Sequence, residues 1–219
     1  MVLIGPSGSG KSSLLNIVAG NLTHYTGDVH IDAHPIDYKK HHIGFVAQNF
    51  GLLPWKTVYQ NVLLPLKIKK QPLPTYEARI NDILTQLGIA ELKNRYPHQL
   101  SGGQMQRVSL AKALVMPLDL LLLDEPFSAL DAITRERANG LFLKVWQALQ
   151  PTTLLVTHSI EEAVYLGQKI VILSQQGKIL EAFDNAAFGL ENPRAQMAFV
   201  QMSQRIRRVI QTWEDHDET

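Results

Sequence analysis

Gly5-Pro6-Ser7-Gly8-Ser9-Gly10-Lys11-Ser12-Ser13 is the stretch that decides the fold of this chain. It fits the pattern of a glycine, four residues and then Gly-Lys-Ser, which is typical of a phosphate-binding loop between a strand and a helix. Its glycines allow a tight turn whose backbone N–H groups converge on one anion. Lys11 adds a charge that can reach outer phosphates, and the Ser12 hydroxyl is a natural Mg²⁺ ligand. The stretch predicts binding of a nucleoside triphosphate.

The neighbours of this loop support that interpretation. Val2–Ile4 is a short apolar run that predicts a strand, and the spacing over Ser13–Ala19 predicts a helix that Gly20 ends. The strand therefore leads through the loop to a helix N-terminus, where the helix dipole favours a bound anion. A glycine-rich turn that matches by chance is the alternative, and the strand and helix around the loop count against it.

Composition restricts the class of protein. The 219 residues suffice for one core with a smaller subdomain, and 45% hydrophobic with 19% charged residues is typical of soluble globular chains. A formal net charge of +1 indicates no polyanionic partner, so we expect no nucleic acid. The absence of cysteine excludes disulfides and thiolate metal sites. No apolar run approaches the roughly 20 residues that span a bilayer, and the start does not resemble a signal peptide.

The middle of the chain changes from strand periodicity to helix periodicity. Alternating residues over 28–32 and an apolar run over 43–47 predict two strands, and the second ends at Gln48. From 52 to 100 the apolar spacing is helical. This change predicts a helical insertion between strands of the nucleotide-binding core.

Capping residues predict where the inserted helices begin and end. Thr57 is placed to cap the first helix, which breaks at Pro72 and Pro74. Thr75 is placed to cap the second helix, which Gly88 ends.

Polar residues that could take part in catalysis follow two later strands. Leu120–Leu123 is a continuous apolar run, typical of a buried parallel strand, and Asp124 and Glu125 come directly after it. Leu154–Val156 is a similar run, and His158 follows it. Because the carboxyl ends of parallel strands share one sheet edge, the phosphate loop, the carboxylates and the histidine are predicted to meet there. One carboxylate can anchor Mg²⁺ and the next can polarise an attacking water; a solvated acidic turn and a core histidine are the plainer alternatives.

A second stretch, Leu100-Ser101-Gly102-Gly103-Gln104, leads into a predicted helix over Met105–Val115. Ser101 is a good N-cap, and the two glycines allow close backbone approach, so this helix start also suits an anion. The chain then has two phosphate-binding helix starts but one lysine-bearing loop. Two chains arranged head to tail, with each nucleotide between the loop of one and the Ser-Gly-Gly turn of the other, would account for both.

The end of the chain predicts a hairpin and a helix. Apolar runs over 170–173 and 179–180 flank Gln175-Gln176-Gly177, which predicts the hairpin. Beyond Pro193 apolar residues recur at helical spacing with arginines on the polar side. We expect this amphipathic helix to dock on the protein, and a membrane-surface or partner contact is the alternative.

In this order the motifs resemble those of an ATP-binding cassette subunit of a membrane transporter, over nearly the whole chain. The matching segments are Walker A at Gly5–Ser12, the Q-loop at Gln48, the signature at Leu100–Gln104, Walker B at Leu120–Asp124 followed by Glu125, the D-loop at Ser128–Asp131 and the switch histidine His158. The resemblance implies an α/β fold of the P-loop NTPase (RecA-like) class. It comprises a parallel-sheet core with a partial antiparallel β subdomain (1–50 and 115–185), an inserted α-helical subdomain (51–114) and a helical tail (186–219).

The resemblance also implies roles for individual residues. Glu125 would be the catalytic base, and His158 would contact the γ-phosphate and help hold the attacking water. Gln48 would link Mg²⁺ to the helical subdomain, and Asp131 would lie at the seam of the dimer. The implied contacts to ATP are Gly5, Pro6, Ser7, Gly8, Ser9, Gly10, Lys11, Ser12, Ser13, Gln48, Ser101, Gly102, Gly103, Gln104 and Asp131, and the implied Mg²⁺ ligands are Ser12, Gln48 and Asp124.

By the same resemblance the chain hydrolyses Mg-ATP as a homodimer or paired cassette and drives transmembrane permease subunits, with a solute-binding protein as an indirect partner. That implies a cytoplasmic protein, peripheral on the inner face of the cell membrane. Residues 52–58 and 161–166 are similar to bacterial importers of nitrate, sulfonates and taurine. Asn61-Val62, Phe127 and Ala129 belong to the same importer-like pattern. The ATPases of lipoprotein release and peptide export, which residues 61–66 also resemble, are the alternative.

The start of the chain departs from the family pattern. Met1–Ile4 precede the loop, whereas the family has a few dozen residues there, including strands and an aromatic residue that stacks on adenine. We therefore expect a truncated N-terminus or weaker nucleotide binding, and a nucleotide-binding regulatory module with poor hydrolysis is a further alternative. A DNA-repair cassette would need a long coiled coil, for which the insertion from Leu52 to Leu100 is too short and is broken by prolines. A translation-type protein would carry two cassettes in one chain, whereas one set of motifs is found here.

Overall fold

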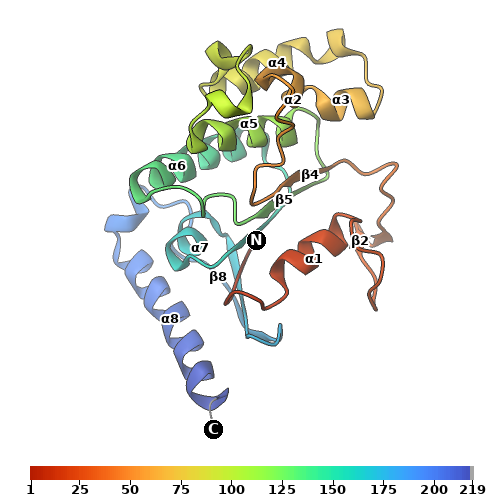
Figure 1. Ribbon diagram of the computed structural model, residues 1–219. Coiled ribbons are helices and arrows are strands. Elements are labelled where there is room, and N and C mark those ends of the chain that lie inside the picture. The colour runs from red at the N-terminus through yellow and green to blue at the C-terminus, as the bar shows by residue number, and fades with distance from the viewer. Residues whose placement is uncertain (218–219) are drawn as a thin grey trace. The chain divides into compact units, whose positions relative to one another are not determined.

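The computed structural model describes residues 1–217, with side chains described up to Trp213. The chain divides into two compact units: Met1–Thr26 together with Thr153–Thr219, and Gly27–Thr152. Both units combine strands with helices (Figure 1).

The first unit is built on a sheet with β1 (Val2–Ile4) between two parallel neighbours, β6 (Thr153–Thr157) and β7 (Lys169–Leu173). All three side chains of β1 are buried, as expected for a parallel strand covered on both faces. β8 (Ile179–Asp184) pairs antiparallel with β7. The predicted closing hairpin is therefore confirmed.

Helices cover this sheet. They are α1 (Lys11–Val18), α7 (Ile160–Leu166), the short 3₁₀ helix η3 (Pro193–Ala195) and α8 (Met197–Asp217). α8 packs against α7 (Figure 1). The side chains of Phe199, Met202 and Ile206 on α8 are buried. Arg205 of α8 forms an ion pair with Glu181 and lies 4.3 Å from the ring centroid of Phe183, which are both on β8. The predicted amphipathic helix is thus present and docked.

The second unit contains the parallel pair β4 (Ile43–Val46) and β5 (Leu120–Asp124). A Cβ on Gly44 of β4 would lie 2.9 Å from the carbonyl oxygen of Ala113. Ala113 belongs to α5 (Gly102–Leu114), so this helix packs directly onto the backbone of β4. The two predicted strands of this unit over 43–47 and 120–123 are confirmed.

A small ribbon replaces the longer strand predicted over 28–32. β2 (His30–Ile31) and β3 (His34–Pro35) pair antiparallel. Asp32 and Ala33 join them with φ values of 51° and 64°. Two successive left-handed residues form the tight turn whose twist matches a hairpin, so the chain reverses where a longer strand was expected.

Helices form most of the rest of the second unit. They are α2 (Val58–Val62), α3 (Leu64–Ile68), α4 (Leu73–Gln86), the 3₁₀ helices η1 (Ala90–Leu92) and η2 (Pro97–Gln99), α5, and α6 (Ala132–Leu149). Thr57 caps α2 in a capping box with Gln60, which confirms that prediction. α5 begins at Gly102, three residues earlier than expected, because Ser101 and Gln104 form a second capping box around its first turn.

The predicted cap at Thr75 is wrong. α4 begins at Leu73, with Pro72 at the N-cap and Pro74 in the first turn. A proline is tolerated there because the first-turn N–H groups have no partner inside the helix. Pro74 therefore starts this helix, where the sequence pattern indicated a break.

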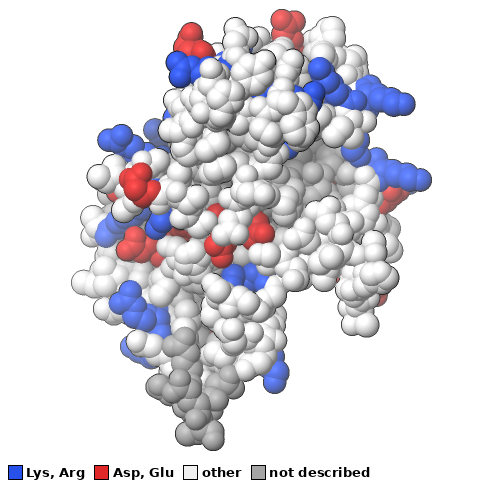
Figure 2. Space-filling view, in the orientation of Figure 1, with Lys and Arg blue, Asp and Glu red and all other residues white. Residues whose placement is uncertain are grey.

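Charge and hydropathy agree with the composition. On the face shown in Figure 2, basic and acidic side chains are interspersed, with no large field of one sign. Among residues 1–217, no helix is long and apolar enough to cross a bilayer.

Candidate nucleotide-binding and catalytic site

The phosphate loop connects β1 to α1, as the sequence predicts. Gly8 and Gly10 have φ values of 84° and 85°, in the left-handed region that favours glycine. Lys11 is 4% exposed, and its Nζ donates to the carbonyl oxygens of Gly5, at 2.9 Å, and of Pro6. Nζ also lies 3.2 Å from the Ser9 hydroxyl oxygen. The ammonium is therefore held inside the loop, where it can meet a phosphate.

The hairpin β7–β8 packs against the phosphate loop and forms a hydrogen bond with it. Gln175 Nε2 donates to the carbonyl oxygen of Ser7 at 3.1 Å. A Cβ on Gly5 would lie only 2.9 Å from the carbonyl oxygen of Leu173. Sequence analysis identified Gln175 as a turn residue alone, because its partner lies 168 positions away.

His158 lies beside the phosphate loop in the same unit. Ile4 of β1 is paired with Thr157 of β6 in the parallel ladder. Gly5 and His158 are therefore the first residues after two adjacent strands, at the same edge of the sheet. His158 itself is exposed. The predicted proximity of the loop and this histidine is thus present within the first unit.

The second unit brings Gln48 and Glu125 together. Val46 of β4 is paired with Leu123 of β5, and each polar residue follows two positions later. Gln48 Nε2 donates to Glu125 Oε2 across 3.4 Å. Asp124, the last residue of β5, is 8% exposed. The glutamine and both carboxylates therefore share one sheet edge.

The backbone at Glu125 adopts an uncommon conformation. Its φ is 44°, in the left-handed region where a side chain costs about 1–3 kcal/mol. The turn is closed by Ser128, whose Oγ and N donate to the carbonyl oxygen of Glu125 at 2.9 and 3.2 Å. Such outliers cluster at functional sites, where the surroundings hold a side chain in a required direction.

The signature residues begin α5 at the rim of a hollow of about 370 Å³. A Cβ on Gly103 would lie 3.0 Å from Thr134 Cγ2, so glycine lets α5 and α6 approach closely. The hollow is lined by Ser101, Gly103, Arg107, Thr134, Arg137, Ala138 and Leu141. Gly102 and Gln104 lie in the first turn of α5. This helix start is open to a ligand.

Asp131 caps α6 by accepting a hydrogen bond from the Thr134 backbone N at 3.0 Å. Hydrogen bonds from Thr134 to the carboxylate hold the pKa of Asp131 below its usual value. Arg135 donates to the carbonyl oxygens of Phe127 and Leu130, at 3.2 and 2.7 Å, and so fastens the preceding loop. The placement of Asp131 at a dimer seam stays a prediction.

Gln106 is a site residue that sequence analysis missed. It is fully buried on α5, and its Nε2 donates to the carbonyl oxygen of Pro126 at 2.9 Å. It thereby ties the signature helix to the turn that carries Glu125. Its partner is a backbone carbonyl 20 positions away, which leaves no sequence pattern by which this glutamine could be recognised.

The oxygen donors predicted for a metal suit Mg²⁺. Within residues 1–217, no group of three or more His, Cys, Asp or Glu side chains is placed to hold a metal. Mg²⁺ is commonly held by one or two carboxylates together with substrate phosphates and water. The buried carboxylate of Asp124 and the hydroxyl of Ser12 are donors of that kind.

Comparisons with known proteins define the class. The family model described as ABC transporter matches residues 1–128. The chain is 36% identical over 223 residues to the taurine import ATP-binding protein TauB of Rhizobium johnstonii, covering 98% of this chain and 85% of the relative. It is 41% identical over 180 residues to the aliphatic sulfonates import ATP-binding protein SsuB of Bacillus subtilis, with coverage of 82% and 69%. The nitrate import ATP-binding protein NrtD of Synechococcus elongatus is 40% identical over 186 residues, with coverage of 82% and 68%.

Solved structures agree with these relatives. The dimeric structure of MJ0796, a bacterial ABC transporter cassette, has a TM-score of 0.72 and 34% identity, with 84% of each chain covered. A post-hydrolysis state of that cassette with ADP and Pi has a TM-score of 0.71. The fold and the ordered motifs are those of a P-loop ATPase cassette. The chain belongs to the ABC transporter family, as an ATP-binding subunit.

Proposed function

We propose that this chain hydrolyses Mg-ATP to drive import of a small solute such as taurine, a sulfonate or nitrate. The observation that supports the hydrolytic part is the Gln48–Glu125 hydrogen bond at the end of β5, which orients a carboxylate that can accept a proton. The solute class rests on the three relatives, which are import ATP-binding proteins for taurine, aliphatic sulfonates and nitrate.

In this mechanism the first unit holds the phosphates. Backbone N–H groups of Gly5 and of residues 7–13 and the Lys11 ammonium bind the β- and γ-phosphates, and His158 contacts the γ-phosphate. Bound Mg²⁺ supplies neutralisation of phosphate charge, and Ser12, Asp124 and Gln48 are the residues that would hold it.

The base accepts a proton from the attacking water. Glu125 Oε takes that proton as the water oxygen bonds to the γ-phosphorus and the bond to the β-phosphate oxygen breaks, which yields ADP and phosphate. Gln48 orients Glu125 through the hydrogen bond described above. Ser101, Gly102, Gly103 and Gln104 of a second cassette complete the site, and Asp131 lies at the seam between the two.

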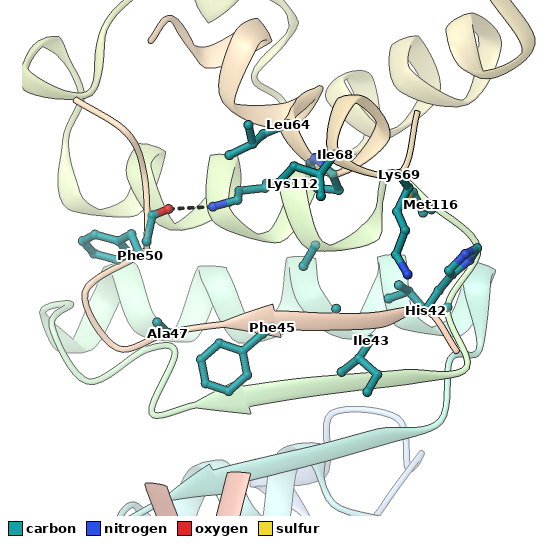
Figure 3. Close-up of a pocket in the computed structure, with 15 residues that line it drawn as sticks. His42, Ile43, Phe45, Ala47, Phe50, Leu64, Ile68, Lys69, Lys112 and Met116 are labelled. Carbon is teal, nitrogen blue, oxygen red and sulfur yellow. Dashed lines mark hydrogen bonds between the residues drawn. The ribbon is translucent and has the colours of Figure 1, made fainter. Parts of the chain in front are cut away.

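An apolar hollow of about 390 Å³ in the second unit is the proposed permease-docking surface. Figure 3 shows that Phe45 of β4, Leu64 and Ile68 of α3 and Met116 line it. Lys112 donates to the carbonyl oxygen of Gly51 at its edge, at 2.6 Å (Figure 3). Burial lowers the pKa of Lys112 from its usual value.

An exposed tryptophan lies in the segment that follows Gln48. Trp55 is 69% exposed, whereas Leu52 and Leu53 are half-buried. Exposed aromatic residues of this size commonly anchor protein interfaces. We include Trp55 in the docking surface for a permease, which implies a peripheral location on the cytoplasmic face of the membrane and a solute-binding protein on the other side.

We propose three functional segments for the chain. Residues 1–50 and 115–185 form the nucleotide core, residues 51–114 form the helical segment that carries the signature, and residues 186–219 form the tail. The signature helix α5 and the hollow beside α3 both belong to the helical segment and the strands next to it. A movement of that segment could therefore affect both the nucleotide and the permease.

Reconstitution tests this function directly. The chain is combined in liposomes with the permease and binding protein encoded beside its gene, and ATP-dependent uptake of taurine, an alkanesulfonate and nitrate is measured. We expect ATP-driven uptake of one of these solutes, lost in the Glu125→Gln variant. Solute-independent ATP hydrolysis without uptake would contradict import, and absence of hydrolysis in the complete complex would contradict the enzymatic assignment.

A further inference from the structure

A buried carboxylate closes the turn that presents His158. The Thr157 hydroxyl donates to Glu162 Oε2 at 2.7 Å. Thr157 is 2% exposed and Glu162 3% exposed. A buried carboxylate is unfavourable unless hydrogen bonds compensate it, so this bond ties its partners together firmly.

Two further hydrogen bonds complete the turn between β6 and α7. The Ser159 backbone N donates to Thr157 Oγ1 at 3.0 Å. The Ser159 hydroxyl oxygen in turn accepts from the Glu162 backbone N at 3.3 Å and caps α7. The residues on both sides of His158 are therefore fixed to Glu162, while the histidine side chain is exposed.

The same turn is coupled to the phosphate loop. Thr157 is paired with Ile4, and Gly5 begins the loop at the next position. A change in the direction of the Thr157 hydroxyl would thus alter the backbone at the end of β6, where His158 lies beside the phosphate loop. No sequence pattern singled out Glu162, because Glu161 beside it has the same charge and is exposed.

We propose that Glu162 is a positioning residue for His158. Its carboxylate holds the Thr157 hydroxyl, which holds the Ser159 backbone, and the imidazole between them is directed toward the γ-phosphate of ATP. This inference rests on the proposed role of His158 in hydrolysis. Glu162 itself does not touch the nucleotide, so its removal should slow turnover without weakening ATP binding.

Four variants test this chain of contacts. Glu162→Ala and Thr157→Val remove one partner each, and we expect turnover to fall about 10- to 100-fold, the scale for a displaced catalytic group, with the Kd for ATP changed less than about twofold. Glu162→Gln and Thr157→Ser keep an acceptor and a hydroxyl, and we expect turnover within about threefold of the natural protein.

Glu161→Ala is the matched control. It removes a carboxylate from the same first turn of α7, but from the solvent side, so any general effect of charge near the helix N-terminus appears in both variants. We expect it to leave turnover unchanged. Equal losses in the Glu161 and Glu162 variants would overturn the positioning role and indicate a helix-dipole effect.

Coupling to His158 separates positioning from general stability. With His158→Ala already present, Glu162→Ala should cause no further loss of turnover, because the group it positions is gone. Independent, multiplicative losses would overturn the inference, as would lower ATP affinity and a lower melting temperature with turnover unaffected.

Imidazole signals give a readout that needs no activity. In ¹H–¹⁵N spectra of the histidine rings we expect the His158 signals to shift or broaden in Glu162→Ala and Thr157→Val, and to stay unchanged in Glu162→Gln and Glu161→Ala. Unchanged His158 signals in Glu162→Ala would overturn the inference. If the His158 signals respond to the variants as expected but the natural protein does not hydrolyse ATP, the proposed function is contradicted and the positioning role is not.

Discussion

The side-chain amide of Gln48 donates a hydrogen bond to the carboxylate of Glu125, with 3.4 Å between Nε2 and Oε2. The two residues follow Val46 and Leu123, which are paired in the parallel ladder of β4 and β5. Glu125 also carries a left-handed backbone angle. Strand register and turn conformation together therefore aim this carboxylate at the glutamine.

Changing Glu125 to Gln tests its role as the base. The amide keeps the size and the contact with Gln48 but cannot accept the proton of the attacking water. We expect turnover to fall by at least about 10²-fold, the scale for a positioned proton acceptor, with ATP binding intact. Single-turnover hydrolysis and equilibrium ATP binding measure the two effects. Unchanged turnover would remove Glu125 from this role.

A mixture of two inactive variants tests the shared site. Lys11→Ala disables the phosphate loop, and Ser101→Arg blocks the helix start of α5. In a head-to-tail dimer that contains one copy of each variant, one of the two sites is intact. Each mixed dimer should therefore have up to about half the ATPase activity of a natural dimer. Steady-state ATPase assays of the mixture and of each variant alone give the answer. No recovery over a range of mixing ratios would contradict two complementary half-sites.

Trp55 provides a test of the docking surface. Because this side chain is 69% exposed, Trp55→Ala should leave the melting temperature and the basal ATPase rate nearly unchanged. We expect permease binding to weaken by about tenfold or more, as for an aromatic anchor at an interface. Co-purification and surface-binding measurements with the reconstituted permease detect this loss. Undiminished binding would exclude Trp55 from the interface.

Asn61 holds the segment that presents Trp55. It is fully buried, its Oδ1 accepts from Leu53 N at 2.8 Å, and its Nδ2 lies within 3.1 Å of the carbonyl oxygens of Leu53, Lys56 and Thr57. Asn61→Ala leaves these groups without their partner, so we expect a loss of about 2–4 kcal/mol in the free energy of unfolding. Urea denaturation measures it, with exposed Glu77→Ala on α4 as a surface comparison. A loss under about 0.5 kcal/mol would show that water replaces the side chain.

Acid stability tests the cap at Asp131. Hydrogen bonds from Thr134 lower its pKa in the folded protein below the unfolded value of 3.8. Its stabilising contribution is therefore complete above the unfolded pKa and is lost as the pH falls through the lower folded value. Asp131→Asn keeps a capping acceptor that does not titrate, so its unfolding free energy should depend less on pH below about 4. Identical acid profiles of the two proteins would contradict this assignment.

The sequence by itself determined the motifs and the class of fold. The phosphate loop needs a local pattern of glycines with Lys11, and the buried parallel strands need continuous apolar runs, so both are visible in consecutive residues. Thr57 and Ser101 were recognised as caps for the same reason, since their partners lie three residues away. Thr75 was misjudged because two prolines nearby can begin a helix as well as break one.

Only the tertiary structure decided which distant groups hold the site residues in place. Gln175 donates a hydrogen bond to the carbonyl oxygen of Ser7, and Gln106 donates one to that of Pro126. Arg135 donates to a backbone carbonyl oxygen in the loop before α6. A backbone carbonyl looks the same at every position of a sequence, so such partners are chosen by packing and strand register alone. The bond between Thr157 and Glu162 shows the same limit, because burial distinguishes Glu162 from Glu161 and a sequence prints both as the same letter.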